Sequence, residues 1–152
     1  MSISTEQIKQ LRELTDVSIG ECKKALEEAN GDFEKAKEIL RERSVKAADK
    51  KSDRTLGAGI VASYLHQGGL VGAMVELMCE TDFVAKNEDF KVLARDIAMQ
   101  VAATPGFEEA TLLESPFVKN PDITIEGLIK ESILKFGEKI EVGQVARFAP
   151  ME

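Results

Sequence analysis

Residues 60–79 read IVASYLHQGGLVGAMVELMC, and two alternating runs flank a central Gln67-Gly68-Gly69. Alternation with a period of two predicts β-strands, and two such runs joined by a glycine-rich turn predict an antiparallel hairpin. One side of the second run carries four apolar residues, Val71, Ala73, Val75 and Leu77. Met74 and Met78 occupy the other side, so we expect that face of the hairpin to be largely covered too.

The residues after the hairpin predict helices and one more strand. From about Asn87 the apolar residues follow a helical period until Thr104-Pro105-Gly106, which predicts one long helix that covers the hairpin. Residues 106–122 contain two prolines and are expected to cross the surface with at most a short turn of helix. A final helix follows and ends at Gly137, and the alternating run from Ile140 to Phe148 predicts a third strand beside the hairpin. The fold class is therefore α+β, with a three-stranded antiparallel sheet packed with helices.

The first 45 residues predict a separate bundle of three short helices. Ser4, Ser18 and Asp32 each stand where a side chain caps a helix, and Asn30-Gly31 supplies a left-handed stop. The domains expected are a three-helix module at 1–45, a charged linker at 46–56 and an α+β core at 57–152. By pattern alone, the polar side of the second helix, which includes Lys23, is an ordinary solvated surface.

Composition limits the classes of function. The 152 residues carry a formal net charge of -7, which argues against direct nucleic-acid binding and favours a protein partner. The chain has neither a signal-peptide pattern nor an apolar run of about 18 residues, so we expect a cytoplasmic protein without a membrane span. Cys22 and Cys79 lie far apart in the sequence, which favours two buried reduced thiols and no metal site. We expect no cofactor.

Three stretches together resemble one known family. They are Cys22-Lys-Lys-Ala-Leu-Glu-Glu-Ala-Asn-Gly-Asp32, then Glu80-Thr-Asp-Phe-Val-Ala-Lys-Asn87, and near the end Pro116-Phe-Val-Lys-Asn-Pro121 with Gly137-Glu-Lys-Ile-Glu-Val142. The family that they resemble is elongation factor Ts. They occur in the family's order and cover essentially the whole chain. The chain resembles a short form of the family with a single core unit.

The resemblance implies a ubiquitin-associated-like helical module, a linker and an α+β core. It also implies an exchange factor that binds elongation factor Tu in its GDP form and expels the nucleotide. By similarity, Asp82 and Phe83 enter the nucleotide domain of the GTPase, with Thr81 and Val84 beside them, and disturb its magnesium and phosphate site. The weaker contacts that the resemblance implies come from three residues, Lys23, Lys50 and His66.

Other interpretations of these residues remain open. Phe83 could pack against its own core, as residues at strand-to-helix junctions often do, and Asp82 could simply cap the long helix. An enzyme is disfavoured, because the chain has one histidine, no P-loop, no G-x-S-x-G and no metal-spaced cluster. A helical binding module without exchange activity would need only residues 1–45, and it would leave the Thr81–Val84 segment unexplained.

The chain also departs from the family. Asp16-Val17-Ser18 replaces a common glycine-rich turn, Leu70 and Gly143-Gln144 stand where basic residues are common, and Met78 replaces a common Asn. Many members have a second core repeat that has no counterpart here. Short members compensate by dimerising, and a three-stranded sheet has an unpaired edge that can pair with another chain. We therefore predict a homodimer.

Overall fold

The structure is a computed structural model that describes residues 2–152. These residues form six α-helices, a three-stranded antiparallel sheet and a two-stranded one, which confirms the predicted α+β class. The chain divides into two compact units. The first contains residues 1–53 and 129–138, and the second contains residues 54–128 and 139–152.

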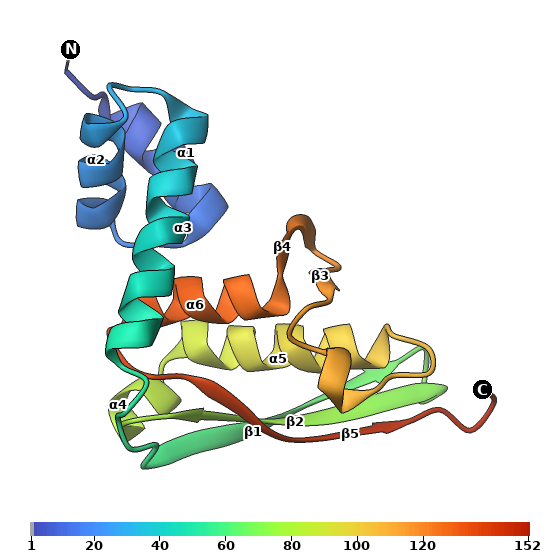
Figure 1. Cartoon of the computed structure of the whole chain (residues 1–152). Coiled ribbons are helices and arrows are strands. Elements are labelled where there is room, and N and C mark those ends of the chain that lie inside the picture. The colour runs from blue at the N-terminus through green and yellow to red at the C-terminus, as the bar shows by residue number, and fades with distance from the viewer. Residues whose placement is uncertain (1) are drawn as a thin grey trace. The chain divides into compact units, whose positions relative to one another are not determined.

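Three helices make up most of the first unit: α1 (Thr5–Thr15), α2 (Ile19–Glu28) and α3 (Phe33–Lys50) (Figure 1). Each begins at a predicted cap: the side chains of Ser4, Ser18 and Asp32 accept backbone N–H groups of the first turn. Because ten to eighteen residues of weakly apolar helix are only marginally stable alone, the bundle depends on its shared core. That core contains Leu11, Val17, Cys22, Ala25, Leu26, Ala29, Ala36 and Leu40.

The first unit also includes most of the last helix, α6 (Ile125–Phe136). Leu134 packs against the core of the three helices. Lys135 Nζ lies 2.5 Å from Asp16 Oδ2, at the turn between α1 and α2. Residues 129–138 therefore add a fourth helical segment to the N-terminal bundle.

The second unit is built on the strands β1 (Ala58–His66), β2 (Val71–Cys79) and β5 (Glu141–Phe148). Their order is β1-β2-β5, so the hairpin and the third strand lie where the sequence predicted them. The β1–β2 turn uses three residues with positive φ, Gln67, Gly68 and Gly69, and glycine adopts that conformation without a steric penalty.

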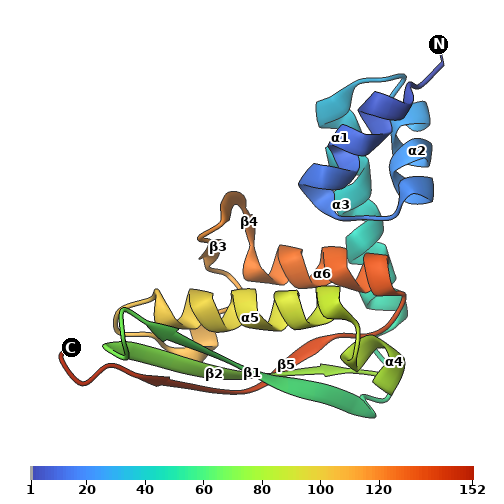
Figure 2. The same ribbon diagram turned by 180° about the vertical axis from the view of Figure 1, so that it is seen from behind.

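One face of this sheet is covered by the long helix α5 (Glu88–Ala102), as Figure 1 and Figure 2 show. Ala73, Val75 and Leu77 of β2 point into this buried layer, together with Phe90 and Ile97 of α5.

The other face of the sheet is not covered, contrary to the expectation drawn from Met74 and Met78. Met74 is 52% exposed, and Val61 and Leu65 on the same side of β1 are also exposed. Met74 and Met78 do place apolar side chains on this face. Alternation alone does not say whether a second layer of this chain covers both faces.

Residues 106–122 hold more structure than predicted. A single 3₁₀ turn (Glu109–Thr111) is followed by a small hairpin of β3 (Pro116–Phe117) and β4 (Asn120–Thr124). The buried side chain of Gln100 donates to the Pro116 carbonyl at 2.9 Å and accepts from the Val118 N–H at 2.8 Å. This long-range anchor has no local sequence signal, so the hairpin was missed.

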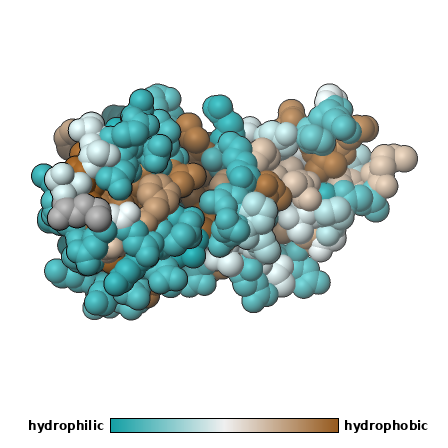
Figure 3. Space-filling model, turned by 90° about the horizontal axis from the view of Figure 1, so that it is seen from above, coloured by the Kyte–Doolittle hydropathy of each residue, from teal (hydrophilic) through white to brown (hydrophobic). Residues whose placement is uncertain are grey.

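Figure 3 shows one side of the molecule, on which hydrophilic side chains cover a large part and hydrophobic ones lie in groups between them. Cys22 and Cys79 are both buried and form no disulfide, as predicted. Within residues 2–152, no helix is both long and apolar enough to cross a membrane.

Candidate functional site

The segment Thr81–Val84, here called the Phe83 corner, lies between strand β2 and helix α5. Asp82 begins a four-residue helix, α4 (Asp82–Ala85), and the Thr81 hydroxyl caps it by accepting the Val84 N–H at 3.4 Å. A second cap follows at once, because Asn87 Oδ1 accepts the Asp89 N–H at 2.8 Å and starts α5. Two successive caps thus confine the chain to one short helical turn between rigid elements.

Phe83 is the most exposed large hydrophobic residue described, with 91% of its surface accessible. Thr81 and Asp82 are exposed too, and Val84 is partly exposed. Ala85, at the end of the same turn, is buried. The turn is therefore anchored through Ala85 and presents Phe83 to solvent, so the interpretation in which Phe83 packs against its own core is wrong.

The cap of the long helix is Asn87. Asp82 does not serve that purpose, which corrects the alternative role considered for it. Its carboxylate is exposed in the first turn of α4. There a negative charge interacts favourably with the helix dipole and stays accessible to a partner.

Glu80 lies immediately before the corner and is largely buried. Its Oε2 accepts the backbone N–H of Lys139 at 2.6 Å and lies 3.5 Å from Nη1 of Arg54. The sequence identified Glu80 only as part of the family motif and gave it no role. No local pattern brings residue 80 next to residues 54 and 139, so only the tertiary structure reveals this contact.

His66 is not close to the Phe83 corner. It pairs with Val71 at one end of the β1–β2 hairpin, whereas Cys79, at the other end, pairs with Ala58. Eight residues of strand separate these ends, or roughly 26 Å at 3.3 Å per residue. The ring of His66 is exposed, and its Nδ1 lies 3.0 Å from the hydroxyl of Tyr64.

Lys23 and Lys50 belong to the first unit. Lys23 is exposed on α2, and Lys50 is the exposed last residue of α3. Both ammonium groups are thus accessible to a partner. Exposed lysines are also common on any solvated helix surface.

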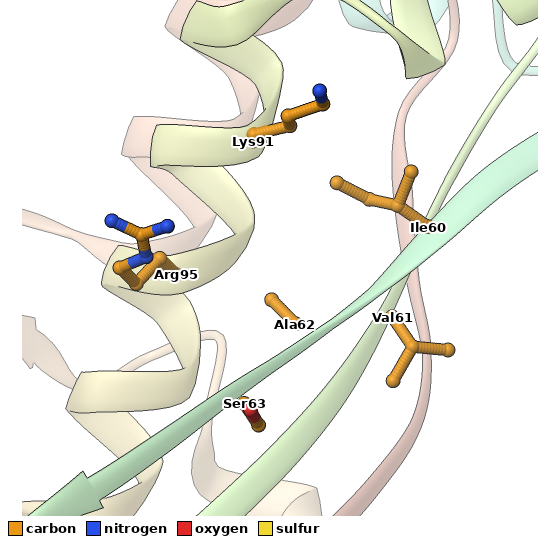
Figure 4. A pocket seen from close by; sticks show the side chains of 6 residues that line it. All are labelled: Ile60, Val61, Ala62, Ser63, Lys91 and Arg95. Carbon is orange, nitrogen blue, oxygen red and sulfur yellow. The ribbon is translucent and has the colours of Figure 1, made fainter.

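A shallow pocket of about 300 Å³ lies beside α5 and the edge strand β1. Lys91 and Arg95 of α5 line it (Figure 4). Its remaining lining comes from Ile60, Val61, Ala62 and Ser63. The lining includes no residue of the Phe83 corner. Among residues 2–152 there is also no group of three or more side chains able to hold a metal ion.

Comparison with known proteins identifies one family. The family model described as elongation factor TS matches residues 80–152, a stretch that includes the Phe83 corner. Elongation factor Ts of Carboxydothermus hydrogenoformans and that of Desulforamulus reducens are each 41% identical, covering 96% of this chain and 88% of their own length. Chloroplastic elongation factor Ts of Rhodomonas salina is 38% identical with the same coverage.

These alignments extend over 191 or 192 positions, which exceeds the 152 residues of this chain. The relatives therefore contain residues that have no counterpart here. The similarity nevertheless spans nearly the whole sequence and both units of the structure. This chain belongs to the elongation factor Ts family of translation elongation factors.

Proposed function

We propose that this protein is a guanine nucleotide exchange factor that binds elongation factor Tu in its GDP-bound and nucleotide-free forms. In this proposal the Thr81–Val84 segment inserts near the magnesium and phosphate site and promotes release of GDP. Family membership supports it. The observation that carries it is the exposure of Phe83, at 91%, on a capped and anchored turn.

A ring held in solvent is available for burial in a partner. Transfer of one Phe side chain from water to an apolar crevice is worth about 1.5–3 kcal/mol. Each ~1.4 kcal/mol spent on distorting the nucleotide-bound state speeds release roughly tenfold. Phe83 alone is therefore insufficient for a large acceleration, and further contacts must contribute. We propose Lys23, Lys50 and His66 as weaker contacts of this kind.

The mechanism is thermodynamic linkage. A factor that binds the empty GTPase more tightly than the loaded one weakens nucleotide binding by the same ratio. In P-loop GTPases magnesium bridges the phosphate oxygens, so a small displacement at this site removes several contacts together. Asp82 contributes an exposed carboxylate beside the inserted ring. No covalent bond is made or broken, so the proposed activity is not enzymatic.

We also propose a division of labour along the chain. The helical module at 1–45 supplies broad contact surface, and the core at 57–152 carries the Phe83 corner. Residues 46–56 act as a charged linker, of which residues 46–50 form the end of α3. Limited proteolysis tests the linker, because preferential cleavage within residues 46–56 is expected if the segment opens locally.

The test is release of a fluorescent GDP analogue from elongation factor Tu. The protein is expected to accelerate release, and Phe83→Ala is expected to remove most of that acceleration. Asp82→Ala should lower it less severely, and Lys23→Ala only partly. A matched control is Phe148→Ala, which removes another exposed ring, 72% accessible, from the end of β5. Acceleration by Phe148→Ala should equal that of the unaltered protein.

Equal release with and without the protein would contradict exchange. If the protein then still bound elongation factor Tu through residues 1–45, it would instead be a helical binding module without exchange activity. Loss of acceleration in Phe148→Ala as large as in Phe83→Ala would show that the corner has no special role.

We further propose that the protein forms a homodimer. Strand β1 lies at the edge of the sheet and runs in unbroken register with β2 over nine residues. Its sequence, AGIVASYLH, has no proline and no Asp, Glu, Lys or Arg. Edge strands are normally protected by such residues or by bulges. An unprotected edge of this length can pair with the same edge of a second copy.

A further inference from the structure

The Glu80 carboxylate connects the base of the Phe83 corner to two distant parts of the chain. Its Oε2 accepts the Lys139 N–H at 2.6 Å, and Arg54 Nη1 lies 3.5 Å from the same oxygen. The side chain of Glu80 is 18% exposed, and that of Arg54 is 48% exposed. The short, partly buried bond to Lys139 is the stronger of the two, because charge-assisted bonds strengthen where water is excluded.

Each contact joins Glu80 to a segment that leads into a strand of the sheet. Lys139 lies two residues before strand β5, and Arg54 lies four residues before strand β1. Glu80 itself follows the last residue of β2, where the Cys79 thiol donates to the Thr81 carbonyl at 3.3 Å. The end of β2 and the approaches to β1 and β5 therefore meet at one carboxylate. The exposed turn that carries Phe83 begins one residue further on.

We propose that Glu80 is a positioning residue for nucleotide exchange: by binding Lys139 and Arg54, it holds the Phe83 corner in the conformation that enters the partner. This inference rests on the proposed exchange function. Glu80 need not touch elongation factor Tu. A corner that is already ordered loses little conformational freedom on insertion, so more of the burial energy of Phe83 is available to distort the partner. In a less ordered corner, the loss of conformational freedom on insertion offsets part of the burial energy of Phe83.

Two substitutions separate the hydrogen bond from the charge. Glu80→Gln keeps a side-chain oxygen that can accept the Lys139 N–H, whereas Glu80→Ala removes the acceptor. Glu80→Ala is expected to lower the accelerated rate of fluorescent GDP release about tenfold, the effect of one charge-assisted bond. Glu80→Gln should stay within roughly threefold of the unaltered protein, because it loses the charge but keeps the bond.

A double-mutant cycle with Phe83→Ala tests whether Glu80 acts through the corner. If it does, Glu80→Ala added to Phe83→Ala lowers release little further, because the ring it positions is absent. If the two effects simply multiply, Glu80 acts independently of Phe83 and the proposal is overturned.

Glu76→Ala is a control for loss of a carboxylate between the same strands. Glu76 Oε1 accepts the Gln144 N–H at 3.2 Å and so also links β2 to β5, but away from the corner. Its loss should lower the melting temperature without lowering exchange more than about twofold. Circular dichroism at the assay temperature checks that each variant is folded. If Glu80→Ala does not fold, Glu80→Asp, one methylene shorter, takes its place.

Hydrogen exchange at the amides of residues 81–85 gives a readout that does not depend on elongation factor Tu. These amides should exchange faster in Glu80→Ala than in Glu80→Gln, and equal rates would overturn the positioning role. Failure of the unaltered protein to accelerate GDP release would overturn the proposed function itself. Acceleration that is identical in the unaltered protein and in Glu80→Ala would overturn only this inference.

Discussion

Phe83 shows what the local sequence pattern can and cannot predict about a single residue. Its place between a strand and a helix was clear from the sequence, but either a buried or an exposed ring was compatible with that place. Only the family resemblance favoured a ring directed at a partner. In the structure the buried Ala85 anchors the turn and leaves Phe83 in solvent, so the exposure depends on which side of a four-residue helix faces the core.

Gly143 offers a second residue-scale test. A Cβ atom at this position would overlap the Glu76 carboxylate, so Gly143→Ala is expected to displace that side chain from the Gln144 N–H. Loss of a charged hydrogen bond exceeds the entropic gain from replacing glycine, leaving a net loss of about 1 kcal/mol in the free energy of unfolding. Urea unfolding of both proteins measures the difference.

The control for this prediction removes the Glu76 carboxylate, which a Cβ atom at residue 143 would overlap. In a Glu76→Ala background, Gly143→Ala should be neutral or slightly stabilising, since only the entropic gain remains. An equal loss in both backgrounds would mean that Glu76 is not the cause. The same contact gives a steric reason for the departure at Gly143, because any side chain there would compete with Glu76 for space.

At the scale of elements, the sequence was most informative where caps and periodicity are local. The starts of α1, α2 and α3 and the strands of the main hairpin lie where Ser4, Ser18, Asp32 and the alternation from Ile60 placed them. The β3–β4 hairpin was missed because Gln100, on a distant helix, stabilises it. Proline and polar content in such a segment indicates a loop only when no long-range anchor exists.

Glu131 on α6 predicts a pH dependence of stability. Burial raises the pKa of Glu131 from its ordinary value of 4.5 to about 7, while the charge of Arg41 opposes the rise. Between these two values the folded protein holds a proton that the unfolded chain has released. The free energy of unfolding therefore falls as pH rises across this window, by about 2–3 kcal/mol in total from this one group.

Glu131→Gln removes this titration. Between pH 4.5 and 7.5 the stability of this variant should fall less with rising pH than that of the unaltered protein, as measured by urea unfolding at intervals of pH. Glu42→Gln, at an exposed position on α3, is the control and should follow the unaltered protein. Parallel curves for Glu131→Gln and the unaltered protein would show that Glu131 ionises normally in the fold.

At the scale of the whole molecule, the predicted homodimer is tested by light scattering coupled to gel filtration. At micromolar concentration the mass is expected to be twice that of one chain. Val61→Lys, on the exposed edge strand β1, should shift the population toward monomer, because like charges would face each other across the paired edges. A matched control is Val92→Lys on the exposed side of α5, which should leave the dimer intact. A monomer at every concentration would contradict the proposal.

The sequence alone determined the five longer helices, the three strands of the main sheet, the α+β class and the family. These depend on caps, on periods of two or 3.6 residues and on short motifs, all of which act between neighbours in the chain. The tertiary structure decided which face of the sheet stays uncovered, that residues 129–138 group with the N-terminal helices, and that Glu80 meets Arg54 and Lys139. Such contacts join residues up to 119 positions apart, and side-chain patterns of short period carry no information about them.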